Sequence, residues 1–285
     1  MIYIVIPVFN RWHFTKACLA SLATQTDREF VTVVVDHGST DGTSLNIQTE
    51  FPDVVVLKGD ESMWWTAATN AGVKYALDKN ADHILTLNND LVVGKDYIGH
   101  LVSAALANPK SIVGSVSLDI DLPEKVIFAG ASWNAWIAKY RSAVDLQQPY
   151  SVLRDQYTTV PTAMLPGRGT LIPATAFREA GLFDEVHFPH YMADDDFSLR
   201  AQKLGYALIV DTNCVVFSHV GATGLNGEQR KKKRIAQLKA DFTSIRSPTK
   251  LSVRWQWARK HGKSPLLYFA IDIGRVAFSN LKKRL

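Results

Sequence analysis

Two groups of polar residues have types and positions that could do chemistry. Asn88-Asn89-Asp90 directly follows the hydrophobic run of residues 84–87, and Asp194-Asp195-Asp196 stands further along the chain. Ligands of open α/β sheets bind at the carboxyl ends of the strands. A carboxylate at such an end can hold a divalent cation, and the cation can hold a diphosphate. The alternative for the first group is turn chemistry that closes a strand.

The second group precedes a helical pattern over residues 196–204. One acid is enough to cap a helix and complement its dipole, which is the structural alternative. Three adjacent carboxylates repel one another unless a cation, an arginine or a proton relieves them. Arg200 lies one helical turn beyond Asp196 and could pair with it. We therefore expect a functional role for at least one of these acids, as a general base.

Four further positions are candidates for binding. Asp36 ends a strand and could accept hydrogen bonds from a base or a ribose, or cap the next turn. His219 follows a strand and is either a metal ligand or structural. Trp65 could form a flat wall against a sugar or base, or belong to the core. The glycines on either side of Arg168 allow close approach of a ligand to the backbone, although a turn explains them equally well.

The elements that must position these residues alternate along the chain. Val- and Ile-rich runs at residues 3–8, 31–35, 54–57 and 84–87 read as buried strands, with helical patterns between them. Such alternation predicts an α/β fold with a mostly parallel sheet covered by helices. Residues 111–165 read as sheet edge and loops, and strands return at 170–172, 207–210 and 214–217. No glycine-rich GxGxxG loop or P-loop occurs, which argues against a dinucleotide-binding dehydrogenase and a P-loop kinase.

The charge of the chain is divided unevenly. Residues 230–285 carry 16 Lys or Arg and 2 Asp or Glu, so that residues 1–229 have a net charge of −9 within a total of +5. We expect a catalytic domain over residues 1–228 and a basic, aromatic-rich helical extension over 229–285. Basic residues with tryptophans suit an anionic membrane surface, whereas packing on the domain or on a second subunit is the alternative. No nucleic-acid recognition motif accompanies the charge.

The two cysteines, Cys18 and Cys214, form no disulfide framework or metal-ligand spacing, which predicts a reducing compartment. The first residues lack a basic leader, and no stretch is apolar and long enough for a transmembrane helix. We therefore expect a cytoplasmic protein that is peripheral at the inner face of the cell membrane.

Four stretches in this order resemble family 2 glycosyltransferases. They are residues 4–10 (Ile-Val-Ile-Pro-Val-Phe-Asn), 35–42 (Val-Asp-His-Gly-Ser-Thr-Asp-Gly), 87–90 (Leu-Asn-Asn-Asp) and 194–200 (Asp-Asp-Asp-Phe-Ser-Leu-Arg). The chain looks most like the rhamnosyltransferase-type members that build bacterial polysaccharides. The resemblance implies a GT-A fold, a nucleotide-diphosphate sugar such as a dTDP- or UDP-sugar, Mg²⁺ or Mn²⁺, inversion at the anomeric carbon, and a glycan or lipid-linked acceptor.

The resemblance also implies roles for single residues. Asp90 stands at the metal-binding position of the family's Asp-x-Asp motif, and His219 matches a histidine that completes the metal site in some members. Asp194 matches the catalytic base, and Asp196 matches the acid that follows it. Asp195 is an additional acid, so the base position could shift by one. The predicted donor site comprises Pro7, Phe9, Asp36, Trp65, Asn70, Asn88, Asn89, Gly167 and Arg168.

Two departures from the family pattern keep other functions open. Asn88 replaces the first carboxylate of Asp-x-Asp, and Ala193 replaces the Glu that precedes the base. A catalytically inactive, membrane-associated subunit that binds nucleotide sugars is therefore one alternative, and a nucleotidyltransferase is another.

Overall fold

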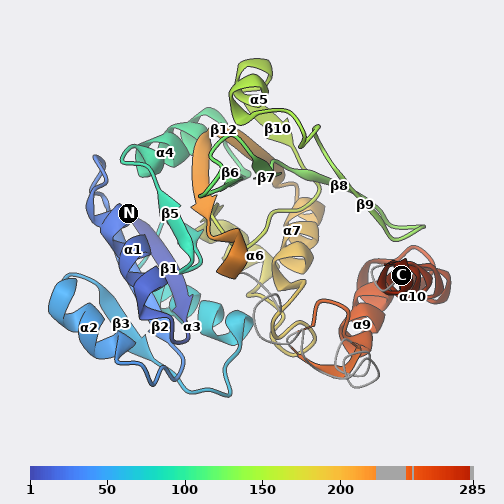
Figure 1. The fold of residues 1–285 in the computed structure, drawn as a ribbon, viewed down its shortest axis with the longest axis horizontal. Helices are drawn as coiled ribbons and strands as arrows, with labels where there is room; N and C mark the ends of the chain where they lie inside the picture. The colour runs from blue at the N-terminus through green and yellow to red at the C-terminus, as the bar shows by residue number, and fades with distance from the viewer. Residues whose placement is uncertain (223–241, 246, 283–285) are drawn as a thin grey trace.

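The computed structural model describes residues 1–222, 242–245 and 247–282 (Figure 1). Strands and helices alternate in its first half, as predicted. The strands are β1 (Ile2–Val8), β2 (Phe30–Asp36), β3 (Val55–Lys58), β4 (His83–Thr86), β5 (Leu91–Val93), β6 (Ser111–Asp119), β7 (Val126–Phe128), β8 (Ala131–Asn134), β9 (Lys139–Ser142), β10 (Thr159–Pro161), β11 (Thr170–Pro173) and β12 (Ala207–Ser218). The helices are α1 (Trp12–Ala23), α2 (Thr43–Glu50), α3 (Trp65–Asp78), α4 (Tyr97–Ala107), α5 (Tyr150–Gln156), α6 (Ala174–Ala180), α7 (Ala193–Lys203), the 3-10 turn η1 (Val220–Ala222), α9 (Leu251–His261) and α10 (Pro265–Lys282).

Ten of the strands form one mixed sheet with the order β10-β12-β6-β11-β4-β1-β2-β3, to which β5 and β7 add at β12 and β6. Strands β1, β2, β3 and β4 are parallel, while β11 runs antiparallel to both β4 and β6. Every residue of β1 is buried, because helices cover both faces of the sheet and leave no solvent side. The carboxyl ends of β1, β2 and β4 therefore meet at one edge.

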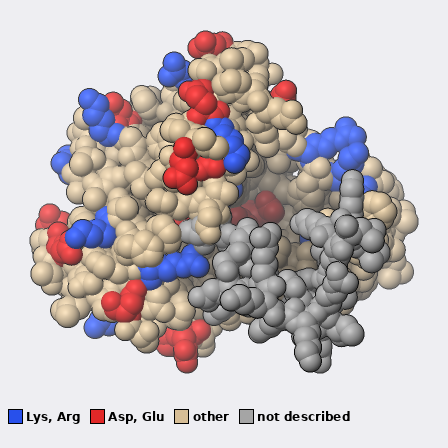
Figure 2. Space-filling view, in the orientation of Figure 1, with Lys and Arg blue, Asp and Glu red and all other residues tan. Residues whose placement is uncertain are grey.

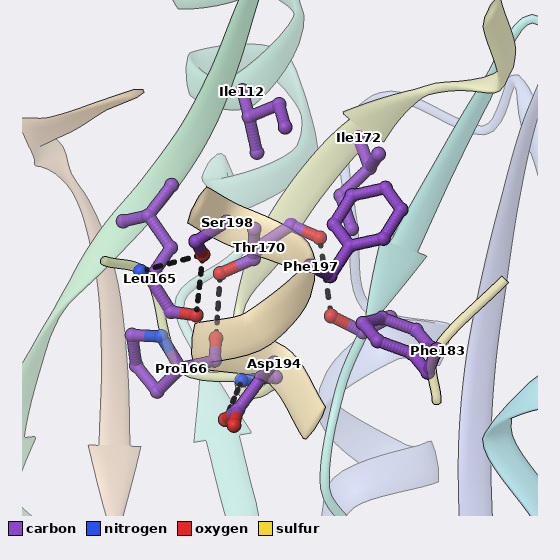
Figure 3. Close-up of a pocket in the computed structure, with 11 residues that line it drawn as sticks. Ile112, Leu165, Pro166, Thr170, Ile172, Phe183, Asp194, Phe197 and Ser198 are labelled. Carbon is purple, nitrogen blue, oxygen red and sulfur yellow. Dashed lines mark hydrogen bonds between the residues drawn. The ribbon is translucent and has the colours of Figure 1, made fainter. Parts of the chain in front are cut away.

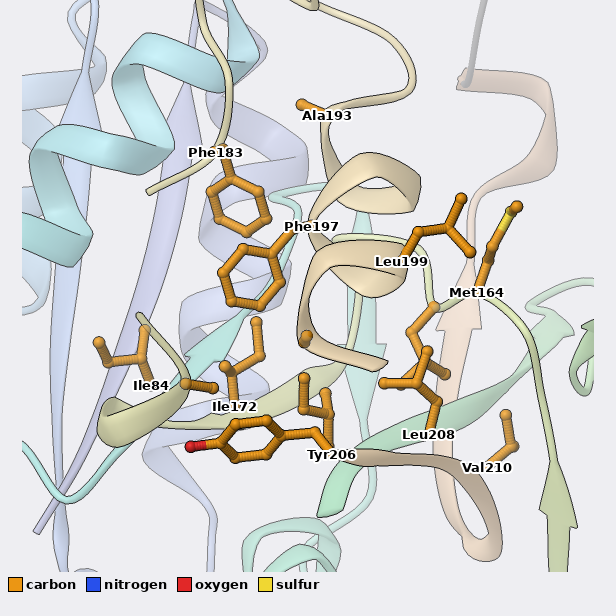
Figure 4. Packing of buried hydrophobic residues seen from close by; sticks show 14 of the residues in the cluster. Ile84, Met164, Ile172, Phe183, Ala193, Phe197, Leu199, Tyr206, Leu208 and Val210 are labelled. Carbon is orange, nitrogen blue, oxygen red and sulfur yellow. The ribbon is translucent and has the colours of Figure 1, made fainter. Parts of the chain in front are cut away.

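The two faces of the sheet carry separate hydrophobic clusters. Residues of α1, α2 and α4 form one cluster, and residues of α3, α6 and α7 form the other. In the second cluster the ring of Phe197 on α7 lies 4.7 Å from Phe177 and 5.1 Å from Phe183. Figure 4 shows Phe183 and Phe197 side by side above Ile172, so that α7 rests on the sheet through its aromatic face.

The prediction for residues 111–165 was partly wrong. Residues 111–119 form β6, a fully buried strand between β12 and β11 in the interior of the sheet. The two strands predicted at 207–210 and 214–217 are a single strand, β12, whose register with β6 shifts between Asp211 and Val215. The rest of the segment contains short strands, among them the hairpin of β8 and β9 that stands apart from the main sheet.

The described part of the C-terminal extension consists of α9 and α10, which contact the body of the protein. Trp257 of α9 is 1% exposed and donates a hydrogen bond from Nε1 to Tyr268 Oη of α10 at 2.9 Å. Trp133 of β8 donates to the same hydroxyl at 3.0 Å. The basic run at residues 230–234 lies outside the described residues. Within the part of the chain that is described, no helix combines the length and apolar character needed to cross a bilayer.

Candidate functional site

The first acidic position lies in the loop that joins β4 to β5. Asn88 accepts a hydrogen bond from Trp65 Nε1 at 2.9 Å, and Asn89 donates one to Thr15 Oγ1 at 3.0 Å. These two bonds hold the loop between α3 and α1. Because β5 pairs with the end of β12, the backbone N–H of His219 reaches the carbonyl oxygen of Asp90 at 3.2 Å. The two predicted metal ligands are therefore neighbours, although 129 positions separate them in the sequence.

The carboxylate of Asp90 is buried and incompletely satisfied. It is 7% exposed, and its Oδ1 has no hydrogen-bond partner among the described residues. Burial raises the pKa of Asp90, and the charges of Arg168, Arg11 and His219 oppose the rise. A buried carboxylate oxygen without a partner is costly unless a ligand or cation satisfies it. Asp90 with His219 therefore fits as part of a divalent-cation site, although the described residues contain no cluster of three or more acidic, His or Cys ligands.

The second acidic position lies at the start of α7. Met192 in the left-handed region (φ 71°) turns the chain into the helix, and the carboxylate of Asp194 accepts the N–H of Gly167 at 2.8 Å and that of Asp195 at 3.0 Å. Gly167 is required here, since a Cβ would lie 2.3 Å from the ring of Trp65. Gly169 donates its N–H to Thr86 O at 2.8 Å, which fixes this loop at the end of β4.

Burial and neighbouring groups shift the pKa values of both Asp194 and Asp195. Asp194 lies at the edge of a small, mostly apolar cavity that Phe183 and Phe197 help to line (Figure 3). Burial raises the pKa of Asp194, while the N–H groups of Gly167 and Asp195 and the charge of Arg168 oppose the rise. Burial also raises the pKa of Asp195, and the charge of Asp194 adds to that rise. The two N–H groups that donate to the carboxylate of Asp194 favour its ionised form.

The side chain of Arg168 interacts electrostatically with both acidic positions. The charges of Asp90 and Asp194 both raise the pKa of its guanidinium, against a larger lowering by burial. Arg168 is thus a mostly buried cation that both carboxylates attract. A cation held in this way can neutralise negative charge that develops on a bound ligand.

Asp196 is turned away from Asp194 toward the C-terminal extension. Its Oδ2 accepts Arg200 Nε at 2.8 Å, and its Oδ1 lies 2.7 Å from both Lys260 Nζ and His261 Nε2. The carboxylate is fully buried, and the pKa of Asp196 falls to about 2 because these contacts outweigh desolvation. The predicted catalytic role of Asp196 therefore has no support in the structure, where it joins α7 to α9.

Asn70 also differs from its predicted role. It is 1% exposed, and its amide donates to Phe183 O at 2.9 Å and to Glu185 Oε2 at 2.7 Å. Its Oδ1 accepts the N–H of Phe183 at 3.1 Å. With both amide protons used, Asn70 holds residues 183–185 against α3 and offers no donor to a nucleotide.

Of the predicted residues at the ends of β1 and β2, some have a structural role and one is exposed at the surface. Asp36 accepts Ser39 N at 2.9 Å and the hydroxyl of Ser44, so both of its oxygens cap the turn that leads into α2. Pro7 is buried in β1. Phe9 is 37% exposed and stacks on His37 with 5.3 Å between ring centroids. Of these predicted donor-site residues, Phe9 presents the most exposed surface.

Sequence reasoning missed three residues near the acids of α7. Lys260 and His261 contact Asp196, and the charge of Asp195 contributes to raising the pKa of Tyr140 on β9, which is 40% exposed. In the sequence, the basic residues around Lys260 indicate only a positively charged segment. No sequence spacing links any of the three residues to α7, because the contacts span more than 50 residues.

The mixed sheet of this order, with acidic residues at a strand end and at a helix start on the same edge, has the GT-A fold of glycosyltransferases, which solved structures share. The model of glycosyl transferase family 2 matches residues 3–173, and the chain belongs to this family.

Relatives and solved structures agree with this class. An L-rhamnosyltransferase of Mycobacterium tuberculosis that acts on N-acetylglucosaminyl-diphospho-decaprenol is 26% identical over 226 residues, which cover 70% of each chain. An uncharacterised protein of Mycobacterium bovis is 27% identical over 226 residues, or 78% of this chain and 75% of that protein.

Two solved structures share the fold at low identity. GalNAc-T7 with UDP, GalNAc and Mn²⁺ has a TM-score of 0.63 at 17% identity, over 76% of this chain. The chain spans 43% of the length of that protein. The mannosyltransferase PcManGT from Pyrobaculum calidifontis, in complex with GDP-Man and Mn²⁺, has a TM-score of 0.59 at 18% identity, over 96% of this chain and 68% of that one.

Proposed function

We propose that the protein is an inverting glycosyltransferase that moves a sugar, with dTDP- or UDP-rhamnose-type donors foremost, to a hydroxyl of a lipid-linked or polysaccharide glycan. The single observation that carries the proposal is the convergence of two acidic positions at one edge of the sheet: residues 167–169 bond to Asp194 at the start of α7 and to Thr86 at the end of β4, the strand that leads to Asp90. The relatedness to a rhamnosyltransferase with a diphospho-decaprenol acceptor supports this choice of donor and acceptor.

In the proposed reaction Asp194 takes the proton of an acceptor hydroxyl. The freed oxygen bonds to the anomeric carbon from the face opposite the leaving group, and the bond from that carbon to the diphosphate oxygen breaks with its electron pair on the diphosphate. A raised pKa suits Asp194 to this task, since a stronger base accepts the proton more readily. Arg168 stabilises the negative charge of the departing diphosphate.

Asp90 and His219 are the residues that would hold a Mg²⁺ or Mn²⁺ ion. Such an ion supplies Lewis-acid neutralisation of the diphosphate charge when it is bound. The buried Oδ1 of Asp90, which lacks a protein partner among the described residues, is the observation that fits this assignment. Asn88 and Asn89 are neutral amides, so Asp90 is the one full negative charge among residues 88–90.

The base assignment is tested with the variant Asp194→Asn. Asparagine can still accept the N–H of Gly167, so the loop and α7 keep their geometry. We expect kcat to fall by about 10²–10⁴-fold, the usual contribution of a general base. Binding of UDP and dTDP with Mn²⁺, measured by calorimetry, should stay within a few-fold of the unmodified protein.

Asp195→Asn is the matched control and should retain most of the transfer rate. If Asp195→Asn loses activity and Asp194→Asn does not, the base lies one position further along. If the unmodified protein binds nucleotide tightly but turns over no donor in a panel of nucleotide sugars, the inactive-subunit alternative is favoured instead.

We further infer that the enzyme works on the cytoplasmic side of a membrane, where lipid-linked acceptors are available, and that its C-terminal extension contributes to this location. The net charge of +14 over residues 230–285 supports this inference. Association into a homo-oligomer is the competing use of the extension.

A further inference from the structure

Helix α10 has two faces of opposite character. Tyr268 and Asp272 are 1% and 6% exposed and face α9, where both oxygens of Asp272 lie 2.6 Å from Arg254 Nη1. The opposite face carries Leu266, Leu267 and Phe278, which are 74%, 50% and 69% exposed. These three positions, with Ala270 and Gly274 between them, follow the period of one helical stripe. The outward stripe of α10 is thus apolar and uncovered by the described residues.

The turn between β8 and β9 extends this apolar surface. Trp136 and Ile137 in the turn are 57% and 40% exposed. Arg275 of α10 donates to Ala138 O at 2.7 Å, and the N–H of Lys263 donates to Ala135 O at 3.1 Å. These bonds fix the turn beside α10. We call Trp136, Ile137, Leu266, Leu267 and Phe278 together the hairpin–helix surface.

The charges around this surface have one sign. Lys139 and Arg141 on β9, Lys263 before α10 and Arg275 on α10 are all exposed. Residues 131–142 contain no acid, and the one acid within 262–282 is Asp272, which is buried and paired. Figure 2 shows basic atoms gathered on the side of the molecule that carries β8 and β9.

We propose that the hairpin–helix surface docks on an anionic lipid bilayer, an inference that rests on the proposed transfer to a lipid-linked acceptor. An apolar helical stripe flanked by basic residues is the pattern of a helix that lies in the membrane interface. Tryptophan is enriched at the headgroup level, and each nearby Lys or Arg is attracted by anionic lipids. A second copy fits less well, because pairing two such faces sets their exposed cations against each other.

The docking surface is structurally connected to the acids of α7. Trp133, in the same hairpin as Trp136, donates to the hydroxyl of Tyr268, which also accepts Trp257 Nε1 of α9, and His261 at the end of α9 pairs with Asp196 of α7. Figure 2 shows a hollow between the main body and the α9–α10 side, with acidic atoms on its floor. A bilayer bound at the hairpin–helix surface would present lipid-linked glycans on the side of the molecule where α9 joins α7.

The test is binding of the full chain to vesicles of phosphatidylcholine with phosphatidylglycerol in equal parts, measured by co-sedimentation. The triple variant Trp136→Ser, Leu266→Ser, Phe278→Ser should weaken binding by at least about tenfold, since it removes three apolar side chains from the interface. Unmodified protein should bind pure phosphatidylcholine much more weakly, and added salt should release it from the anionic vesicles.

A matched triple variant replaces exposed leucines elsewhere. Leu45→Ser, Leu106→Ser, Leu122→Ser removes side chains that are 67%, 76% and 56% exposed, and it should bind vesicles as the unmodified protein does. Circular dichroism melting shows whether each variant is folded. Equal vesicle binding by the two triple variants would overturn the proposal. A dimer of the unmodified protein, detected by ultracentrifugation and broken only by the first variant, would assign the surface to a second copy instead.

Docking and the proposed function can fail separately. The first triple variant should keep its affinity for nucleotide and its transfer to a water-soluble acceptor, and lose transfer to an acceptor embedded in vesicles. If the unmodified protein binds vesicles through this surface but transfers no sugar, the glycosyltransferase proposal fails while the docking surface stands.

Discussion

At the scale of single residues, Arg168 connects the two acidic positions. It is a mostly buried cation attracted by both Asp90 and Asp194, and its charge limits how far burial raises the pKa of either carboxyl. Among the described residues, Arg168 is the cation whose charge lowers the pKa of both Asp90 and Asp194. Burial and the N–H groups of Gly167 and Asp195 shift the titration of the proposed base, and the charge of Arg168 contributes to it.

This dependence predicts a shift in the pH profile of transfer. The base must be ionised, so kcat should rise with pH through the pKa of Asp194, above the ordinary range for a carboxyl. Arg168→Met removes a charge that favours the ionised form, and the acidic limb should move upward by about one pH unit. Arg168→Lys keeps the charge and should leave the limb near its original position. An unshifted limb in Arg168→Met would show that Arg168 does not influence the base.

The sequence predicts some of these residues and misses others for a physical reason. Asp90 and Asp194 follow local patterns, a strand end and a helix start, which a short stretch of sequence reveals. The roles of Asn70 and Asp196 depend on contacts with residues 183–185 and with Lys260 and His261. Such partners are distant in sequence, and local spacing cannot distinguish a binding residue from one that fixes a loop.

At the scale of elements, the pairing of α7 with α9 holds the proposed base in position. Asp196 lies two residues beyond Asp194 and is bonded to Lys260 and His261 at the end of α9. Lys260 also reaches Asp184 at 3.0 Å, in the segment that Asn70 holds. The first turn of α7 is therefore fixed from both the sheet and the extension.

Asp196→Asn should destabilise the protein and change how stability depends on pH. The pKa of Asp196 is lowered from 3.8 to about 2, so its stabilisation is complete above about pH 4 and is lost as the pH falls toward 2. Linkage puts this contribution at about 2 kcal/mol. Urea unfolding across this range should show the difference between the two proteins shrinking with falling pH.

Glu50→Gln serves as the control for that prediction. Glu50 pairs with Lys16 in a surface contact whose side chains are 37% and 53% exposed, so its loss should cost less than about 1 kcal/mol. If Asp196→Asn unfolds with the same pH dependence as the unmodified protein, the network around Asp196 does not stabilise α7 as described.

The strands were predicted correctly where the sequence contains a nearly continuous hydrophobic run. β1, β2 and β4 contain runs rich in Val, Ile and Leu and appear where expected. The residues of β6 belong to the segment 111–165 that was assigned to sheet edge and loops, and Gly114 and three serines interrupt their apolar pattern. Leu165 fills the space beside Gly114, where a Cβ would lie 2.2 Å from Leu165 Cδ2. A buried strand that relies on such a partner cannot be recognised from its own composition.

At the scale of the whole molecule, the body and the described extension share one hydrophobic cluster. Val253, Trp257 and Ala258 of α9 belong to the same cluster as the residues of α3 and α7. The ring of Phe188 lies 6.1 Å from that of Trp257. The predicted division at residue 228 thus marks a change in charge, whereas hydrophobic packing continues across it.

A chain that ends at residue 250 should therefore be less stable than the full protein. It lacks α9 and α10, which exposes Phe188 and leaves Asp196 without two of its partners. We expect the Tm to fall by at least about 10 °C, because breaking a buried ion pair alone costs several kcal/mol. A chain that ends at residue 279 loses no described buried side chain and is the control. An unchanged Tm on removal of both helices would show that the extension is an independent appendage.

The contact between Asp90 and His219 has a consequence for how the enzyme is made. The hydrogen bond joins segments 129 positions apart, and the bond from Asp196 to His261 closes a further long loop. Contacts of such separation form slowly, since loop-closure entropy opposes them. During synthesis the proposed metal ligands can meet only after His219 has left the ribosome, and the base is secured only when α9 follows. Catalytic competence should therefore be one of the last properties that the nascent chain acquires.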